Sequence, residues 1–124
     1  AVGQEGCITS YEIRQGQADR ALKNIRPLIP YSHTLEIKEL DINQGIIESE
    51  IDRLVLDIPE PWQTVPTAAS ALVRGGIFLS FLPTILQVHR LTERLNAEAC
   101  FQLVETVEII LRNWHVTKQG WRSR

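Results

Sequence analysis

The stretch IFLSFL, residues 77 to 82, is the feature that most limits how this chain can fold. In a strand its apolar side chains would lie on both faces, and Pro83 ends the run. A strand that is apolar on both faces is typical of a parallel sheet covered by helices on both sides. The stretch therefore predicts a central strand in an α/β protein.

Strand and helix patterns alternate along the rest of the chain. Short apolar or alternating runs predict strands, and apolar residues at helical spacing predict helices. This alternation implies right-handed crossovers and a mostly parallel sheet with helices on both faces. The expected strands are residues 7 to 12, 34 to 40, 51 to 58, 77 to 82 and 101 to 112; the expected helices are 15 to 29, 61 to 73 and 84 to 97; and 42 to 50 is a turn or short helix.

Proline and glycine set the expected ends of the helices. Pro27 and Pro30 end the first helix, because proline cannot continue it. Pro61 is placed for the first turn of the second helix. Gly75 and Gly76 are expected to close that helix as left-handed cap residues.

The bulk composition fits one soluble domain, residues 1 to 124, with a single core. The chain has 124 residues, of which 44% are hydrophobic and 23% are charged. No apolar run approaches the roughly 18 residues of a membrane helix, and the first residues lack the features of a secretion signal. We therefore expect a cytoplasmic protein without a membrane span. The chain starts without Met and ends in a polar stretch, so we expect an excerpt of a longer protein.

Charge and cysteine usage narrow the range of partners. A net charge of −2 argues against a protein that coats nucleic acid by charge alone. The basic, Trp-containing tail, residues 111 to 124, either binds RNA or is a solvent-exposed end of the chain. Cys7 and Cys100 lie far apart in the sequence without clustered His residues, so we expect buried thiols and no metal site.

Three acids stand at the expected ends of successive strands: Glu12, Asp41 and Asp57. In open parallel sheets, ligands bind beyond the carboxyl ends of the strands. An ionised carboxylate accepts hydrogen bonds at both oxygens, which suits a ribose diol or an exocyclic amino group. The acids therefore predict a ligand that resembles a nucleoside.

Each acid also has a simpler explanation. The glycine-rich turn that precedes a ribose-binding acid by about 20 residues is missing, so Glu12 is as well explained as an ordinary exposed acid. Asp41 is suited to cap the short turn that follows it. Asp57 is suited to the start of a helix, near the helix dipole.

The stretch VLDIPEPW, residues 55 to 62, makes Asp57 the most specific of the three acids. Pro59 and Pro61 stiffen the backbone directly behind it. A stiff backbone would hold Asp57 and Trp62 over the sheet edge with little entropy to lose on binding.

Five stretches of the chain together resemble the tRNA (adenine-58-N1)-methyltransferases, which use S-adenosylmethionine. The resemblance covers almost the whole chain in the same order, and the acid-x-Pro-x-Pro-Trp stretch is its most specific part. The stretches are SYEIR (10 to 14), LDIPEPW (56 to 62), ALVRGGIFLSFLP (71 to 83), TILQV (84 to 88) and NWHV (113 to 116), and the Asp41 position also matches.

The resemblance implies a Rossmann-like, S-adenosylmethionine-dependent methyltransferase fold and a role for each site residue. Glu12 would hold the ribose hydroxyls of S-adenosylmethionine, and Asp41 the adenine amino group of this cofactor. Asp57 would be the catalytic residue that faces the target adenine, with Trp62 and Gln87 shaping the substrate pocket. The resemblance also implies a tRNA partner, a homo-oligomer of tetrameric type and no metal.

The chain departs from the family pattern at two places inside the sheet. The family's first strand with its glycine-rich turn, its N-terminal RNA-binding domain and its final strand have no counterpart in these residues. We therefore expect a truncated catalytic domain. Its sheet should be broken between the strands that end at Glu12 and Asp57.

Three functions are compatible with these residues. The first is methyl transfer to N1 of a flipped-out adenine in tRNA, with Asp57 stabilising the charge that develops on the ring. The second is a non-catalytic subunit of the same fold that binds RNA or acts as a scaffold. The third is a nicotinamide-dependent oxidoreductase, which explains the residues around Asp57 poorly because no hydride-transfer partner lies near them.

Overall fold

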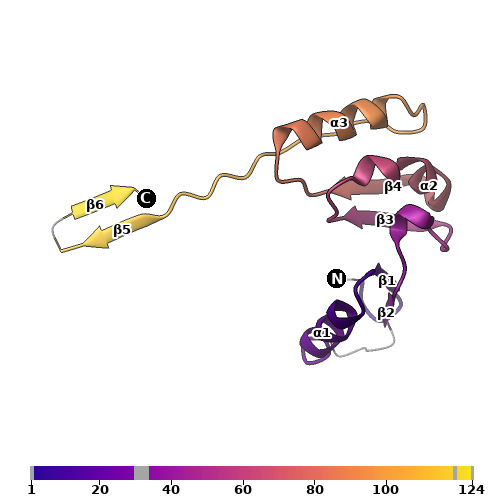
Figure 1. Cartoon of the computed structure of the whole chain (residues 1–124), viewed down its shortest axis with the longest axis horizontal. Helices are drawn as coiled ribbons and strands as arrows, with labels where there is room; N and C mark the ends of the chain where they lie inside the picture. The colour runs from indigo at the N-terminus through magenta and orange to yellow at the C-terminus, as the bar shows by residue number, and fades with distance from the viewer. Residues whose placement is uncertain (1, 30–33, 119, 124) are drawn as a thin grey trace.

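The computed structural model describes residues 2 to 29, 34 to 118 and 120 to 123. Strand pairs and helices form the body of the molecule, and an extended arm leads from the body to a C-terminal hairpin (Figure 1). Within the described residues, no helix is both long and apolar enough to cross a membrane.

The first half of the body is a β-α-β unit. Strand β1 (Ile8–Tyr11), helix α1 (Gln15–Ile25) and strand β2 (Leu35–Lys38) confirm the predicted order in shorter form. Strands β1 and β2 pair in parallel, with Tyr11 opposite Lys38. Helix α1 ends before Pro27 instead of reaching residue 29, because the proline has no N–H to continue the helical hydrogen bonds.

The second half repeats the strand-helix-strand order. Strand β3 (Ile51–Leu56) leads through the short 3-10 helix η3 (Pro61–Gln63) into helix α2 (Val65–Ala71). Strand β4 (Leu72–Ser80) then pairs with β3 in parallel, and helix α3 (Ile85–Asn96) follows. Pro61 begins η3, as its predicted place in a first turn requires, although α2 starts only at Val65.

The predicted helix cap at Gly75 and Gly76 is wrong, because both glycines lie inside β4. The β3–β4 register shifts between Ile51 and Arg53, so the paired strands carry an irregularity there. Gly75 has a φ of +78°, and a Cβ on Gly76 would come within 2.9 Å of a backbone oxygen. The glycines therefore allow a local kink in a strand, which is the other common use of glycine in such a position.

Strand β4 is also less central than its sequence predicts. Among the described residues it pairs only with β3. Ile77 and Leu79 of β4 alternate along the strand with Phe81, which directly follows it. The side chains of these three residues are about half exposed or more. The described elements thus leave this face of β4 largely open, although the sequence of β4 predicts cover on both of its faces.

The hydrophobic core lies in the second half. Leu54 and Leu56 of β3 and Ala68 of α2 form its centre. Phe78 of β4 and Phe101 meet edge to face, with ring centroids 5.7 Å apart. This contact holds the start of segment 101–112 against β4. The partly buried residues around the centre are Ile42, Ile46, Ile51, Ile58, Leu72, Phe78 and Phe101.

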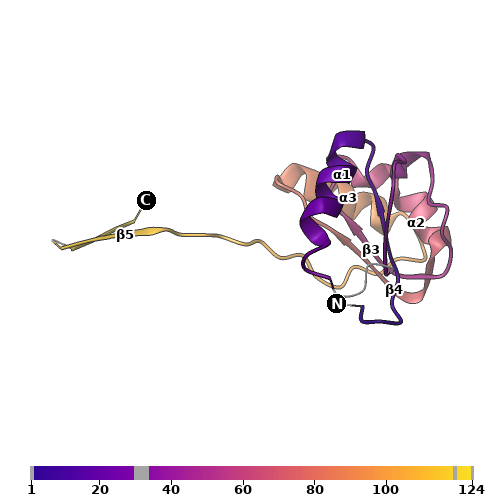
Figure 2. The same cartoon turned by 90° about the horizontal axis from the view of Figure 1, so that it is seen from below.

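The sheet is broken where the sequence predicts a break. Among the described residues, β1 pairs only with β2 and β3 only with β4, so the body holds two separate two-stranded sheets. Figure 2 shows the two halves with their helices in the same body. The segment between them, with the 3-10 helix η2 (Ile42–Gln44), confirms the predicted turn or short helix.

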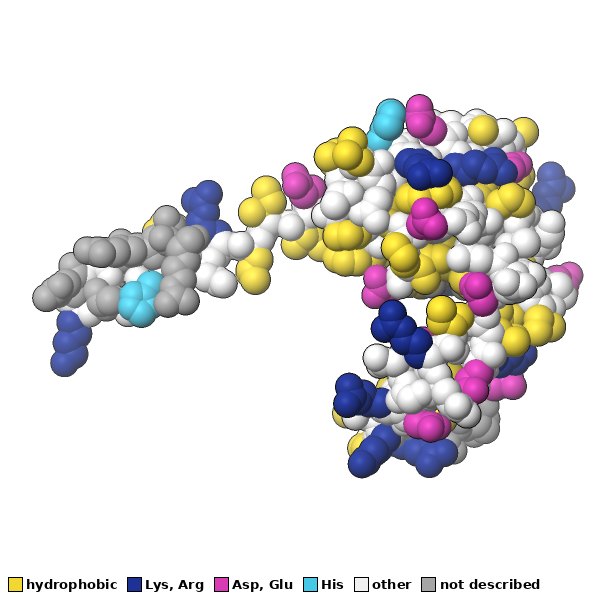
Figure 3. Space-filling model, in the orientation of Figure 1, with side chains coloured by type: hydrophobic (Ala, Val, Ile, Leu, Met, Phe, Trp, Pro, Cys, Tyr) yellow, Lys and Arg dark blue, Asp and Glu magenta, His cyan; other side chains and the backbone are white. Residues whose placement is uncertain are grey.

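The predicted last strand, residues 101 to 112, is wrong. This segment has no regular secondary structure, and apart from Phe101 its apolar side chains are open to solvent, with Val104 90% and Ile109 85% exposed. Figure 3 shows apolar side chains along the arm. A strand needs a neighbouring strand for its backbone hydrogen bonds, and none of the described strands lies beside this segment. Strands β5 (Trp114–Thr117) and β6 (Gly120–Ser123) instead form an antiparallel hairpin with each other.

The two cysteines also differ from their expected environment. Cys7 and Cys100 are free and exposed instead of buried, because each lies outside the packed helices and strands.

Candidate cofactor and substrate site

Glu12 directly follows β1 at the carboxyl end of the first sheet. Its backbone N–H donates to the carbonyl of Lys38 at 3.0 Å, which extends the pairing of β1 with β2 by one step. Its Oε1 accepts a hydrogen bond from the N–H of Arg14 at 2.9 Å. The half-buried carboxylate is thus held at the sheet edge and keeps further lone pairs for a ligand.

Asp41 lies beyond the end of the neighbouring strand, β2. Its Oδ1 accepts from the N–H of Asn43 at 2.9 Å and so caps η2. The simpler explanation of Asp41, a helix cap, is therefore confirmed. Because each carboxylate has about four acceptor positions, the cap leaves room for a second partner, and the cofactor role stays a prediction.

Asp57 directly follows β3 and is exposed. The strand end beneath it is well fixed, because the carbonyl of Leu56 accepts from the N–H of Phe81 at 3.0 Å and from the Ser80 hydroxyl at 3.3 Å. The carboxylate thus stands on a rigid base at the carboxyl end of the second sheet.

Gln87 belongs to the first turn of α3. Its side-chain N–H donates to the carbonyl of Pro59 at 3.1 Å, and its Oε1 accepts from the Thr84 hydroxyl at 2.6 Å. Thr84 in turn caps α3. Gln87 therefore ties the loop that follows Asp57 to α3, while its predicted contact with the substrate stays a prediction.

Trp62 lies in η3 and packs towards α3. The Arg90 guanidinium carbon lies 4.2 Å from the centroid of the Trp62 ring system, within cation–π range. A shallow pocket of about 360 Å³ adjoins this pair, and Glu93, Arg94 and Ala97 of the α3 end complete its lining. With Arg90 in this position, only the other face of the Trp62 ring is open for a base to stack on.

The acids fall into two groups. Glu12 and Asp41 follow neighbouring parallel strands and therefore stand at the same end of one sheet. Asp57 belongs to the other sheet. Among the described residues, no hydrogen bond or ion pair links the three carboxylates.

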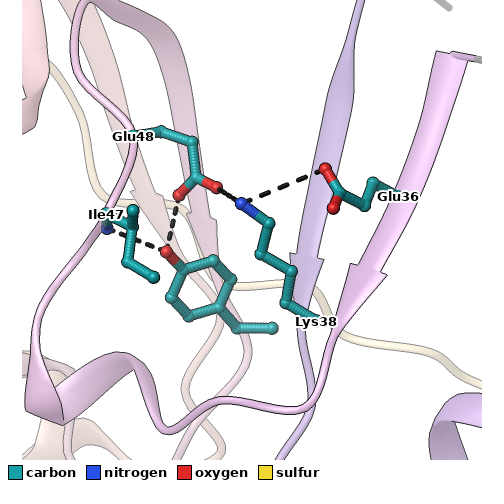
Figure 4. A network of polar contacts seen from close by, with 5 residues as sticks. Glu36, Lys38, Ile47 and Glu48 are labelled. Carbon is teal, nitrogen blue, oxygen red and sulfur yellow. Dashed lines mark hydrogen bonds and ion pairs between the residues drawn. The ribbon is translucent and has the colours of Figure 1, made fainter.

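A polar network that the sequence does not reveal lies next to Glu12 (Figure 4). The Tyr11 hydroxyl donates to Glu48 Oε2 at 2.5 Å and accepts from the N–H of Ile47 at 2.9 Å. Lys38 Nζ donates to Glu48 Oε1 and lies 3.9 Å from Glu36. Glu48 is in an irregular segment, far in sequence from Tyr11, so no periodicity or spacing pairs the two.

The network shifts the pKa values of its members. Burial alone would raise the pKa of Glu48, but hydrogen bonds from Lys38 and Tyr11 outweigh it, and the pKa lies below its ordinary value. Burial, followed by the hydrogen bond to Glu48, raises the pKa of Tyr11. The hydrogen bond to Glu48 raises the pKa of Lys38. At neutral pH these shifts favour an ionised Glu48 that accepts from a protonated Lys38 and a protonated Tyr11.

No described histidine and no described residue of the basic tail takes part in the contacts of this site given above. Among the described residues, no group of His, Cys, Asp and Glu side chains has the arrangement of a metal site. His89 lies on α3, 3.4 Å from Glu93, and His115 lies on β5. His33 and Arg124 are outside the described residues, as are the side chains of residues 121 to 123, so the RNA-binding prediction for the tail stays untested.

Comparison with known proteins agrees with this arrangement. The family model described as "tRNA methyltransferase complex GCD14 subunit" matches residues 1–123. A tRNA (adenine(57)-N(1)/adenine(58)-N(1))-methyltransferase TrmI of Methanocaldococcus jannaschii is 30% identical over 98% of this chain and 52% of its own length. The tRNA (adenine(58)-N(1))-methyltransferase TrmI of Thermus thermophilus is 31% identical over 94% of this chain and 45% of its own length. The chain thus spans about half the length of the curated relatives it matches.

Two solved structures share the fold. An S-adenosylmethionine-dependent O-methyltransferase of Thermotoga maritima superposes with a TM-score of 0.84 at 31% identity, over 100% of this chain and 46% of that one. The TrmI tRNA (m1A58) methyltransferase of Aquifex aeolicus superposes with a TM-score of 0.75 at 22% identity, over 95% of this chain and 47% of that one. The chain has the α/β fold of S-adenosylmethionine-dependent methyltransferases, belongs to the tRNA (adenine-58-N1)-methyltransferase family, and covers part of the catalytic domain.

Proposed function

We propose that this protein methylates N1 of adenine in tRNA, at the position-58 type of site, with S-adenosylmethionine as methyl donor. The observation that carries the proposal is the family match over residues 1–123, together with acids at the carboxyl ends of β1, β2 and β3. The family match leaves no support for a nicotinamide-dependent oxidoreductase.

The residues at the end of the first sheet fit S-adenosylmethionine. This cofactor presents a ribose diol and an exocyclic adenine amine, both of which donate hydrogen bonds. Glu12 and Asp41 offer carboxylate acceptors beyond neighbouring parallel strands, where ligands of such sheets bind. Glu12 would hold the ribose hydroxyls and Asp41 the amine. When bound, the cofactor supplies a methyl group activated by a positively charged sulfur.

Asp57 would face the target adenine as the catalytic residue. N1 of adenine carries a free lone pair at neutral pH, so the reaction needs no general base. The ring becomes more positive as it is methylated, and a carboxylate beside the exocyclic amine stabilises that charge. The strand end fixed by Ser80 and Phe81 and the loop fixed by Gln87 limit the movement of Asp57. Such preorganisation favours the transition state.

The target base must leave the stack of folded tRNA to reach this edge. Trp62 and Gln87 would shape the pocket that receives it. Because Arg90 lies over Trp62, the guanidinium either stays on the far face of the ring or moves when the base stacks. We further propose that the protein acts in the cytoplasm and as a homo-oligomer, of the tetrameric type that the family resemblance implies.

One observation favours a second candidate, a non-catalytic subunit that binds RNA or holds a partner. Glu12 and Asp41 are on one sheet and Asp57 is on another, with no strand pairing between the two sheets among the described residues. Binding of S-adenosylhomocysteine, the product of the cofactor, separates the two candidates, because the subunit would not bind it.

The substitution Asp57→Asn tests the catalytic proposal. Removing one preorganised electrostatic partner costs about 3 kcal/mol of barrier, so turnover of methyl transfer to tRNA should fall about a hundredfold. The affinity for S-adenosylhomocysteine, measured by calorimetry, should stay within about twofold. Asp52→Asn, on the same strand and exposed, is the matched control and should leave both values unchanged. Wild-type turnover in Asp57→Asn would show that Asp57 has another role.

A further inference from the structure

Glu48 lies in the 41–50 segment, which runs from Asp41 through η2 to the start of β3, and no role has been assigned to it so far. Its side chain is 23% exposed, and each carboxylate oxygen accepts from a different strand. Oε2 accepts from Tyr11 at the end of β1, and Oε1 accepts from Lys38 at the end of β2. A single carboxylate therefore joins the carboxyl ends of both strands of the first sheet.

The backbone next to Glu48 is held at the same place. The N–H of Ile47 donates to the Tyr11 hydroxyl, so this hydroxyl acts as donor and acceptor at once. Figure 4 shows Lys38 reaching towards Glu48 on the facing segment. Glu36 Oε2 also lies 3.9 Å from Lys38 Nζ, but the Glu36 side chain is 64% exposed. It makes none of the contacts described for that segment.

The start of the same segment is attached to the second half of the body. The Thr64 hydroxyl donates to Asn43 Oδ1 at 3.0 Å, and Thr64 is fully buried. Ile42 and Ile46 pack against the core of the second half. The segment 41–50 is thus anchored to β1 and β2 by Glu48 and to α2 and the core by its earlier residues.

Asp41 opens this segment, and Glu12 is the direct neighbour of Tyr11. A change in how the segment lies on β1 and β2 would move Asp41 relative to Glu12. We propose that Glu48 is a positioning residue: by binding Tyr11 and Lys38 it fixes the 41–50 segment and so holds Asp41 and Glu12 at the spacing that a bound nucleoside requires. The inference rests on the proposed function, in which these two acids bind S-adenosylmethionine.

Two variants test the positioning role in the whole chain. Glu48→Gln removes the charge and one acceptor, and Tyr11→Phe removes one oxygen atom while keeping the ring. Each variant loosens the contact between the segment and the strands, so each should bind S-adenosylhomocysteine about tenfold more weakly by calorimetry. Asp41→Ala should abolish detectable binding, and Glu36→Gln, the matched control, should bind like the wild type.

A further readout separates positioning from a general loss of structure. The KM for S-adenosylmethionine should rise about tenfold in Glu48→Gln, while the KM for tRNA stays within about twofold, because only the cofactor acids depend on the segment. Amide exchange should speed up at Ile47 and stay unchanged within β3 and β4. In the double variant the losses should not add, because both substitutions break the same contact.

The outcomes are distinguishable. Wild-type affinity in both Glu48→Gln and Tyr11→Phe would overturn the positioning role and leave the proposed function standing. Equal rises in the KM for cofactor and for tRNA would also overturn it. If the wild-type chain does not bind S-adenosylhomocysteine, the cofactor part of the proposed function and this inference fail together. If Glu48→Gln does not fold, Tyr11→Phe alone tests the positioning role. This variant removes no charge and keeps the ion pair between Glu48 and Lys38.

Discussion

The two halves of the body have the same strand-helix-strand plan but are held together differently. In the first half, β1 and β2 are joined at their ends by Tyr11, Lys38 and the Glu48 carboxylate. In the second half, buried apolar side chains centred on Leu56 of β3 and Ala68 of α2 hold helix and strands together. Apolar burial stabilises in proportion to the area buried, whereas a polar contact must also offset the desolvation of its partners, so its net contribution is modest.

Because of this difference, the site residues divide between a more rigid apolar half and a more adaptable polar half. Asp57, which the proposed chemistry needs at a fixed position, stands on the apolar half. Glu12 and Asp41, which the proposed cofactor would engage, stand on the polar half. We therefore expect substitutions in the apolar half to change stability most, and those in the polar half to change ligand binding most.

The largest expected effect on stability is that of Leu56→Ala. Leu56 is 2% exposed, and removing a buried leucine side chain costs about 3 kcal/mol, because a cavity adds to the lost transfer free energy. Chemical denaturation measures the loss. The neighbour Val55 is 66% exposed, so Val55→Ala is the matched control and should cost about 0.5 kcal/mol or less. Equal losses in the two variants would show that burial of Leu56 does not stabilise the second half.

A smaller effect is expected where the two halves meet. Thr64→Val keeps the side-chain shape but removes the hydroxyl that donates to Asn43, at a cost of about 1 kcal/mol. Amide exchange in the 41–50 segment should speed up as well, because one of its anchors is lost. Thr67→Val is the control: its hydroxyl bonds only to the carbonyl of Thr64, so the segment should exchange as in the wild type. Unchanged exchange in Thr64→Val would show that Ile42 and Ile46 suffice as anchors.

The smallest expected effect is a pH dependence of the polar half. The pKa of Glu48 lies below its ordinary value of 4.5, so the ionised form is stabilised by folding. This contribution is complete above pH 4.5 and is lost as the pH falls through the folded pKa. The unfolding free energy of the wild type should therefore fall more steeply below pH 4.5 than that of Glu48→Gln. Parallel curves for the two proteins would contradict a stabilising role of the ionised Glu48.

Much of the fold could be predicted because the local patterns are strong. Alternating and continuous apolar runs located four of the strands, and helical spacing located α1 and α3. The glycine pair at 75 and 76 was misassigned, because glycine allows both a helix cap and a strand irregularity, and local sequence does not distinguish them. The segment 101–112 was misassigned for another reason: it has a strand pattern, but a strand also needs a neighbour.

The site could be predicted only at the level of single positions. Sequence patterns predict that three acids follow strands, namely Glu12, Asp41 and Asp57. The structure confirms that they follow β1, β2 and β3 in that order. The contacts of Glu48 with Tyr11 and Lys38 could not be predicted, because they depend on how an irregular segment returns to a sheet. The same holds for Arg90 over Trp62, which requires α3 to pack on η3.

The class of fold, the order of the elements and the acids that end the strands follow from local sequence patterns. Periodicity and the conformational limits of proline act within a few residues, so they can be read along the chain. The exposed face of β4 and the bridge that Glu48 makes between β1 and β2 emerge only in the folded structure. These features depend on pairing and packing between residues that are distant in sequence, where strand edges and side chains compete for partners across the whole fold.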